Sequence, residues 1–135
     1  MEEAAEIAGY SIAVPGFLPA DFVQTDTIMV NQKSFGEAAW KHVTQIWNWQ
    51  GDPSVRFSLE QSPKPFTLGG ETEPIDINGV PGTRAALEAQ PPGRPHPMLI
   101  LSWTHGDFTY LLNAILGEPL TEEMVLRIAA SVEAQ

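Results

Sequence analysis

The chain has 135 residues, 43% of them hydrophobic, and a formal net charge of −10 at pH 7. This length suits a single domain spanning residues 1–135, and the apolar share is enough to build a core. The negative charge disfavours nucleic-acid phosphates and anionic membrane surfaces as partners. The absence of cysteine excludes disulfides, thiol catalysis and thiolate metal sites.

The N-terminal third is expected to begin irregularly and then form strands. Residues 1–8 are acidic and are interpreted as a frayed lead-in with at most one helical turn. Tyr10–Val14 alternates as a first strand, which Pro15 ends. A second strand is expected over Phe22–Asn31, followed by a connection at 32–37.

The third predicted strand, Trp40–Gln50, is apolar on both sides. Val43, Trp47 and Trp49 share one side, and Trp40 shares the other with Ile46. A strand of this kind is covered twice, lines a cavity or faces a partner.

The middle of the chain continues this strand-and-turn pattern. Val55–Gln61 alternates cleanly, with its apolar residues inward and its polar residues outward. A short strand at 75–78 ends in an Asn78-Gly79 turn, and a further strand is expected over Thr83–Gln90, with Ala85, Leu87 and Ala89 on one side. The proline-dense segment 91–97 is expected to be a surface loop.

The segment Leu99–Leu112 predicts a hairpin with His105-Gly106 as its two-residue turn. With that turn the facing pairs on one side are Trp103 with Phe108, Leu101 with Tyr110, and Leu99 with Leu112. Ile100 and Leu111 pair on the other side, together with Ser102 and Thr109.

An amphipathic helix is predicted over the segment that follows the hairpin, 120–132. Its apolar stripe comprises Leu120, Met124, Val125, Ile128, Ala129 and Val132. Thr121 suits the N-cap, and Leu120 and Val125 suit a hydrophobic staple. The fold class is therefore α+β: a curved antiparallel sheet of about seven or eight strands in meander order, closed by one C-terminal amphipathic helix.

The sequence shows no arrangement typical of a catalytic or metal site. His42, His96 and His105 are scattered, without a paired His spacing, so no metal site and no cofactor are predicted. Nucleophile elbows, phosphate-binding glycine loops and dinucleotide fingerprints are absent. No catalytic residue is assigned, and a non-enzymatic protein is expected.

The aromatic strand is the one feature that points to a binding surface. In the preferred interpretation Trp47 and Trp49 pack beneath the helix and Trp40 covers an edge. In the alternative, an apolar face accepts an acyl chain, a peptide or a partner strand. The candidate binding residues are Trp40, Trp47, Trp49, Ile100 and Leu111, with Met98 beside the last two.

Motifs at both ends of the chain and one in its middle carry a family resemblance. They are Tyr10-x-Ile12-x-Val14-Pro15-x-x-Leu18-Pro19, Ile75-x-Ile77-x-Gly79, Trp103-x-x-Gly106-x-x-x-Tyr110-x-Leu112 and Leu120-Thr121-x-Glu123-x-x-x-x-Ile128-Ala129-x-Ser131. This pattern resembles a bacterial domain-of-unknown-function family of exported lipoproteins and of the outer part of membrane-anchored anti-sigma-factor-like proteins. That family is distantly similar to lipoprotein-carrier and sigma-regulator sheet domains, in which a curved half-barrel cups a helix. The motif residues look structural, so the resemblance transfers no catalytic residue.

The resemblance implies an extracytoplasmic, non-enzymatic binding or sensing module, in envelope-stress or anti-sigma-like signalling. The alternative is a carrier of a lipid or other hydrophobic ligand in the concave face of the sheet. A small hydrolase would require that the fold bring separated Asp, Glu and His residues together. The expected partner is a protein or a hydrophobic small molecule, with membrane attachment only through a segment absent from this chain. Because the chain shows no export signal and no lipobox cysteine, either it is cytosolic or Met1 begins a domain cut from a longer protein.

Overall fold

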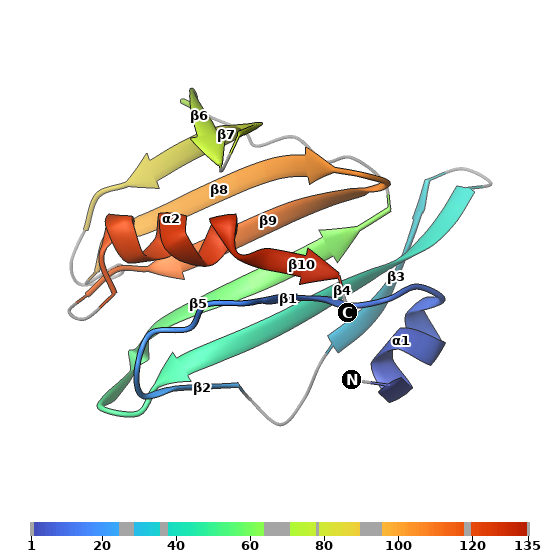
Figure 1. Ribbon diagram of the computed structural model, residues 1–135, viewed down its shortest axis with the longest axis horizontal. Coiled ribbons are helices and arrows are strands. Elements are labelled where there is room, and N and C mark those ends of the chain that lie inside the picture. The colour runs from blue at the N-terminus through green and yellow to red at the C-terminus, as the bar shows by residue number, and fades with distance from the viewer. Residues whose placement is uncertain are drawn as a thin grey trace.

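The computed structural model describes residues 2–24, 29–35, 38–63, 71–77, 79–89, 96–117 and 120–134. These residues form an eight-stranded sheet, a two-stranded sheet and two helices (Figure 1). The elements in chain order are α1 (Glu2–Ala8), β1 (Ala13–Pro15), β2 (Phe22–Gln24), β3 (Met29–Phe35), β4 (Ala38–Trp49), β5 (Asp52–Ser62), β6 (Glu73–Ile77), β7 (Val80–Leu87), β8 (Met98–His105), β9 (Phe108–Ile115), α2 (Glu122–Ala130) and β10 (Val132–Ala134). Neither helix has the length and apolar character needed to cross a membrane, within the part of the chain described.

The main sheet is open and antiparallel, in the order β2-β4-β5-β9-β8-β7-β6, with β3 also paired to β4. The predicted α+β class, with about eight antiparallel strands and a C-terminal helix, is confirmed. The predicted meander order is wrong at two steps, because β5 pairs with β9 and not with β6, and β1 pairs with β10 and not with the next strand. β6 contains Pro74 and is mostly exposed, which suits an edge, whereas β9 buries Tyr110, Leu112 and Ala114.

The predicted second strand, Phe22–Asn31, is divided into two strands that share one edge of β4. Phe22 lies opposite Trp49, and Met29 lies opposite Thr44. The pairing of β3 continues to Phe35, so residues 32–35, predicted as a connection, are strand. An edge strand needs only backbone pairing on one side and accommodates polar side chains, which explains why the hydrophobic pattern does not show it.

The register of the β8–β9 hairpin differs from the prediction by two residues. Trp103 pairs with Tyr110 and His105 pairs with Phe108, so the turn is Gly106-Asp107. Gly106 has a φ of +64° as the first central residue. A turn at His105-Gly106 would place histidine at that position, and glycine reaches a positive φ at much lower cost.

The β6–β7 turn is where it was predicted, but β7 is displaced. Ile77 pairs with Val80 across the turn, where Gly79 has a φ of +87°. Asn78 lies outside the described residues. β7 spans Val80–Leu87, so it begins three residues before the predicted strand at Thr83, and Glu88 and Ala89, predicted as strand, lie beyond its end. Gln90 lies outside the described residues.

The helix α2 is confirmed, with its predicted cap. The Thr121 hydroxyl accepts a hydrogen bond from the Met124 N–H at 3.3 Å. The buried residues of its apolar stripe are Val125, Ile128 and Ala129. The helix ends at Ala130, two residues earlier than predicted.

After α2 the chain returns to pair with its beginning. β10 is antiparallel to β1, with Ala134 opposite Ala13 and Val132 opposite Pro15. Val132, predicted on the helix, is therefore a strand residue, and β1 belongs to this small sheet and not to the main one. Ser131 strengthens the junction, because its carbonyl accepts from Gly16 N–H at 2.8 Å.

Two buried glutamines attach β1 to the main sheet. The Gln61 side chain accepts from Ala13 N–H at 2.8 Å and donates to the Ser11 carbonyl at 3.1 Å. The Gln45 side chain donates to the Ala13 carbonyl at 2.8 Å and accepts from the Gln24 amide at 2.9 Å. Both glutamines are 1% exposed. On the side of β1 that faces the main sheet there is no paired strand, and the two glutamine amides supply the hydrogen bonds that a paired strand would make.

The first eight residues, predicted as a lead-in, include the seven-residue helix α1. The Lys41 ammonium donates to the Ile7 carbonyl at 2.6 Å. Ala5 and Ala8 pack against the small cluster that contains buried Val43. The N-terminal segment is therefore attached to β4.

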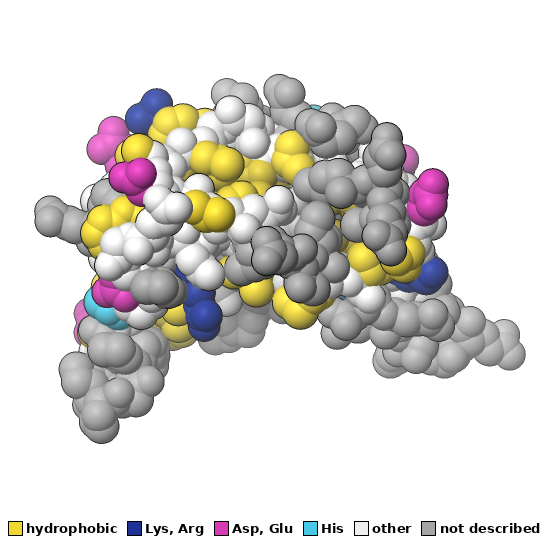
Figure 2. All heavy atoms as spheres, turned by 90° about the horizontal axis from the view of Figure 1, so that it is seen from below, with side chains coloured by type: hydrophobic (Ala, Val, Ile, Leu, Met, Phe, Trp, Pro, Cys, Tyr) yellow, Lys and Arg dark blue, Asp and Glu magenta, His cyan; other side chains and the backbone are white. Residues whose placement is uncertain are grey.

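One face of the main sheet, which we call the helix face, is covered by α2 and the β1–β10 sheet (Figure 1). The core lies between them and includes Phe57, Leu101, Leu112 and Ile128. The opposite face carries the alternate side chains of the same strands, and we call it the open face because no described helix or second sheet covers it. Seen from below, hydrophobic side chains reach the surface in several patches, with charged side chains toward the two ends (Figure 2).

Candidate functional site

The tryptophans singled out in the sequence are divided between the two faces of β4. Trp47 is 4% exposed on the helix face and stacks on Phe57, with ring centroids 5.1 Å apart. Trp49 is partly buried and packs against the same core. Trp47 and Trp49 therefore contribute to core packing.

Trp40, Ile100 and Leu111 lie on the open face and are each partly buried. Ile100 and Leu111 are diagonal neighbours on β8 and β9, because Ile100 pairs with Asn113 and Leu111 with Ser102. Trp40 lies toward the start of β4, on the other side of β5. The structure thus brings Ile100 and Leu111 together and keeps Trp40 apart.

A cavity of about 220 Å³ is present on the open face near these residues. Ile46, Met98 and Ile115 supply its apolar lining, and Arg56, Ser58 and Asn113 supply polar groups. Ile100 and Leu111 are not among its lining residues.

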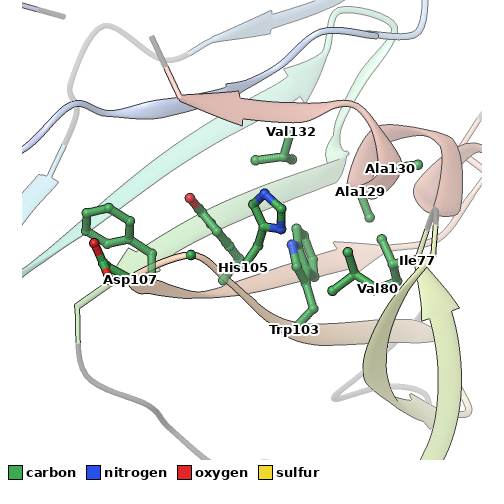
Figure 3. A pocket seen from close by; sticks show the side chains of 11 residues that line it. Ile77, Val80, Trp103, His105, Asp107, Ala129, Ala130 and Val132 are labelled. Carbon is green, nitrogen blue, oxygen red and sulfur yellow. The ribbon is translucent and has the colours of Figure 1, made fainter.

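A larger cavity, of about 450 Å³, lies on the helix face between the β8–β9 hairpin and the junction of α2 with β10 (Figure 3). We call it the hairpin cavity. Its lining residues come from four places: Trp103, Phe108 and Tyr110 on the hairpin strands, Ile77 and Val80 beside the β6–β7 turn, Ala129, Ala130 and Val132 at the α2–β10 junction, and His105, Gly106 and Asp107 at the hairpin turn.

The hairpin strands give this cavity a continuous aromatic wall. The observed register places Trp103 directly opposite Tyr110, and their rings stack with centroids 5.5 Å apart. The Phe108 ring is 6.4 Å from that of Tyr110 and 4.8 Å from that of Tyr10. Trp103 and Tyr110 are only 6% and 5% exposed, so surrounding residues fix their orientation.

Polar groups are concentrated at the end of the cavity formed by the hairpin turn. The close-up shows His105 next to Trp103, Asp107 on the turn side, and Ile77 and Val80 at the far end (Figure 3). Within the described part of the chain, no hydrogen bond engages the Trp103 indole N–H or the Tyr110 hydroxyl. The cavity therefore has one apolar end and one end with free hydrogen-bonding groups.

Tyr110 in this wall and its neighbour Tyr10, which contacts Phe108 but does not line the cavity, are both held in their neutral form. Tyr10 donates to the Lys41 carbonyl at 2.7 Å, and burial, together with the nearby Tyr110, raises the pKa of Tyr10 to about 12. Burial also raises the pKa of Tyr110. Among the described lining residues, Asp107 is therefore the one source of negative side-chain charge.

A Ser, a His and an Asp do meet elsewhere, at the beginning of β5. The Ser54 hydroxyl donates to the Asp52 carboxylate at 2.7 Å and lies 3.5 Å from His96 Nε2. The hydrogen bonds from Ser54 lower the pKa of Asp52. A serine nucleophile requires the histidine between the serine and the carboxylate, whereas here the serine lies between them. This group is a surface turn.

The remaining histidine also makes a local contact, since His42 Nε2 lies 3.0 Å from the Glu60 carboxylate on the open face. Among the residues described, no group of three or more His, Asp and Glu side chains is placed to hold a metal ion.

The sequence pattern does not predict the hairpin cavity. It gives Trp103, Gly106 and Tyr110 a structural place in the hairpin, and it places the candidate binding residues on the aromatic strand and at Ile100 and Leu111. The informative signal was a polar turn, His105-Gly106-Asp107, flanked by aromatic residues. Recognising the cavity also required the pairing of β10 with β1, which places Val132 over the hairpin.

Comparison of the chain with protein-family models, with curated proteins and with solved structures gave no match. A function for this chain must therefore be inferred from the hairpin cavity and from the sequence motifs.

Proposed function

We propose that this chain is a non-enzymatic binding module that holds a small, mainly apolar ligand in the hairpin cavity. The observation that carries the proposal is the cavity itself, about 450 Å³ in volume and lined by aromatic and aliphatic side chains with polar groups at one end. Small-molecule sites typically have volumes of about 300–1,000 Å³ and this combination of linings.

The architecture supports a preformed site. Trp103 and Tyr110 lie on β8 and β9, which have paired neighbours on both sides in the main sheet. Ala129 is 3% exposed and belongs to the same core. A ligand would therefore meet walls that are already ordered, which lowers the entropic cost of binding.

The biological setting is proposed from the sequence resemblance. An extracytoplasmic sensor in envelope-stress or anti-sigma-like signalling would bind the ligand and present a changed surface to a partner protein. A carrier of a lipid or other hydrophobic molecule would use the same cavity. A sensor releases its ligand readily, whereas a carrier retains it through purification, so native mass spectrometry of the purified chain separates the two.

The binding proposal is tested with the neutral fluorescent probe phenylnaphthylamine. We expect a dissociation constant of about 10–100 μM from the size of the probe. Ala130 is exposed and lines the cavity, so Ala130→Trp fills it from the surface without disturbing the core. Ala20→Trp adds the same side chain at an exposed position remote from it.

The expected result is that Ala130→Trp weakens probe binding at least about tenfold and that Ala20→Trp leaves it unchanged. Urea unfolding of both variants verifies that they are folded. Equal binding by the two variants, or no binding by the unmodified chain, would overturn the proposal.

A further inference from the structure

We infer that the ligand of the hairpin cavity is an organic cation, an amine or quaternary ammonium with an apolar body. This inference rests on the proposed function and adds the chemical class of the ligand. Three independent features of the cavity support it: its aromatic wall, its charged lining and the end of α2 that faces it.

The aromatic wall provides the first argument. Trp103, Phe108 and Tyr110 present aromatic rings to one cavity. The face of an aromatic ring carries negative electrostatic potential and attracts an ammonium group, most strongly on tryptophan. Of these three residues, Tyr110 is the one that can ionise, and burial raises its pKa, so it stays neutral.

The charges around the cavity provide the second argument. Asp107 lies at the turn end, while no described lysine or arginine side chain lines the cavity. Three of those basic side chains are engaged elsewhere: Lys41 with the Ile7 carbonyl, Arg84 with two glutamates, and Arg127 over the Phe17 ring at 4.2 Å. A chain with a formal charge of −10 adds a long-range field of the same sign.

The direction of α2 provides the third argument. Ala129 and Ala130, its last two residues, line the cavity, so its C-terminal end lies beside the proposed ligand. Arg127, in the same last turn, lies over the Phe17 ring and is not among the lining residues. That end of a helix carries a partial negative charge and favours cations. Acidic Glu122 and Glu123 are in the first turn, at the opposite end.

The shape of the cavity indicates how the cation would lie. Ile77 and Val80 close one end, and Asp107 lies at the other, beyond Trp103 (Figure 3). The apolar body would pack at the Ile77 end, and the ammonium group would sit at the turn end, over the aromatic wall and near the Asp107 carboxylate.

The test uses three probes that share one naphthyl body: naphthylethylammonium, naphthylethanol and naphthylacetate. Each displaces phenylnaphthylamine from the unmodified chain at low salt and at about pH 8. We expect the cation to bind about three- to tenfold more tightly than the alcohol, and the anion more weakly than both. High salt should reduce these differences, because it screens exposed charges.

Two variants locate the effect. Asp107→Asn should remove most of the difference in affinity between the cation and the alcohol. Glu123→Gln removes the same formal charge at the far end of α2 and should leave the preference in place.

The outcomes separate this inference from the proposed function. Equal affinity for the three probes, with Ala130→Trp still blocking them, would refute the cation and leave an apolar binding site. A preference that Asp107→Asn and Glu123→Gln reduce equally would also refute it, because overall charge would then be the cause. Failure of all probes to bind would refute both.

Discussion

Replacing Gln61 with leucine should destabilise the fold by removing the attachment of β1 to the main sheet. The side chain is 1% exposed and makes two hydrogen bonds, to the N–H of Ala13 and to the carbonyl of Ser11. Leucine has a similar volume, so it leaves no large cavity. The main effect is therefore on the backbone groups of β1.

The size of the loss in the free energy of unfolding depends on which of these backbone groups water can reach. Ala13 is 0% exposed, so its N–H would lose its partner without gaining water, at a cost of about 1–3 kcal/mol. Ser11 is exposed, so its carbonyl can be hydrated and adds about 0.5 kcal/mol. The greater hydrophobicity of leucine offsets part of this. We expect a net loss of about 2 kcal/mol in the free energy of unfolding.

Urea unfolding followed by tryptophan fluorescence measures this loss. With a urea dependence of about 1–3 kcal/mol/M, the unfolding midpoint should fall by roughly 1 M. The matched control is Gln50→Leu, because the Gln50 side chain is exposed and the change there should stay within about 0.5 kcal/mol. Amide exchange should also accelerate in β10, whose partner β1 is loosened. If the two variants have the same midpoint, the glutamine bonds do not hold β1 and the reasoning is refuted.

Three further predictions concern single contacts. Thr121→Ala should lower the free energy of unfolding by about 1 kcal/mol, because the helix loses its N-cap, while Thr121→Ser should retain it; chemical denaturation distinguishes them. Arg84→Met breaks ion pairs with Glu73 and Glu122 that are largely exposed, so we expect a loss below about 1 kcal/mol that disappears at high salt. Because the pKa of Tyr10 is raised to about 12, its contribution to stability is complete below pH 10 and is lost as the pH rises toward 12; stability measured against pH should fall less steeply there in Tyr10→Phe.

Local patterns allowed the central elements of the fold to be predicted. The alternation of Val55, Phe57 and Leu59 identified β5, and the stripe of Val125 and Ile128 identified α2, because each pattern records which side of one element is buried. Thr121 marked the helix start for an equally local reason. A helix or strand can be predicted from the sequence when about ten consecutive residues determine which of its sides is buried and where it begins.

Pairings between distant segments were not visible in the same way. β1 and β10 have three residues each, too few to show a period, and they meet only after the whole sheet has formed. Gln45 and Gln61 face the core because β1 needs hydrogen bonds there, whereas glutamine is ordinarily an exposed residue.

The candidate site was missed because it depends on these distant contacts. Trp103 and Tyr110 share one side of the hairpin, as predicted, but the space beside them is closed by Ala129 and Val132 from the layer that covers the sheet. The shift of the hairpin turn by one position, to Gly106-Asp107, also places Asp107 where it reaches the cavity.

The pairing of β1 with β10 has a consequence for the order of events in this molecule. It closes a loop of nearly the whole chain, so it pays the largest closure entropy of any pairing in the fold and is expected to form last. For the same reason it should be among the first contacts to open. Val132 belongs to this pair and also lines the hairpin cavity, so under the proposed function a bound ligand would stabilise the pairing of β1 with β10. Tension that separates Ala13 from Ala134 would then weaken ligand binding before the main sheet opened.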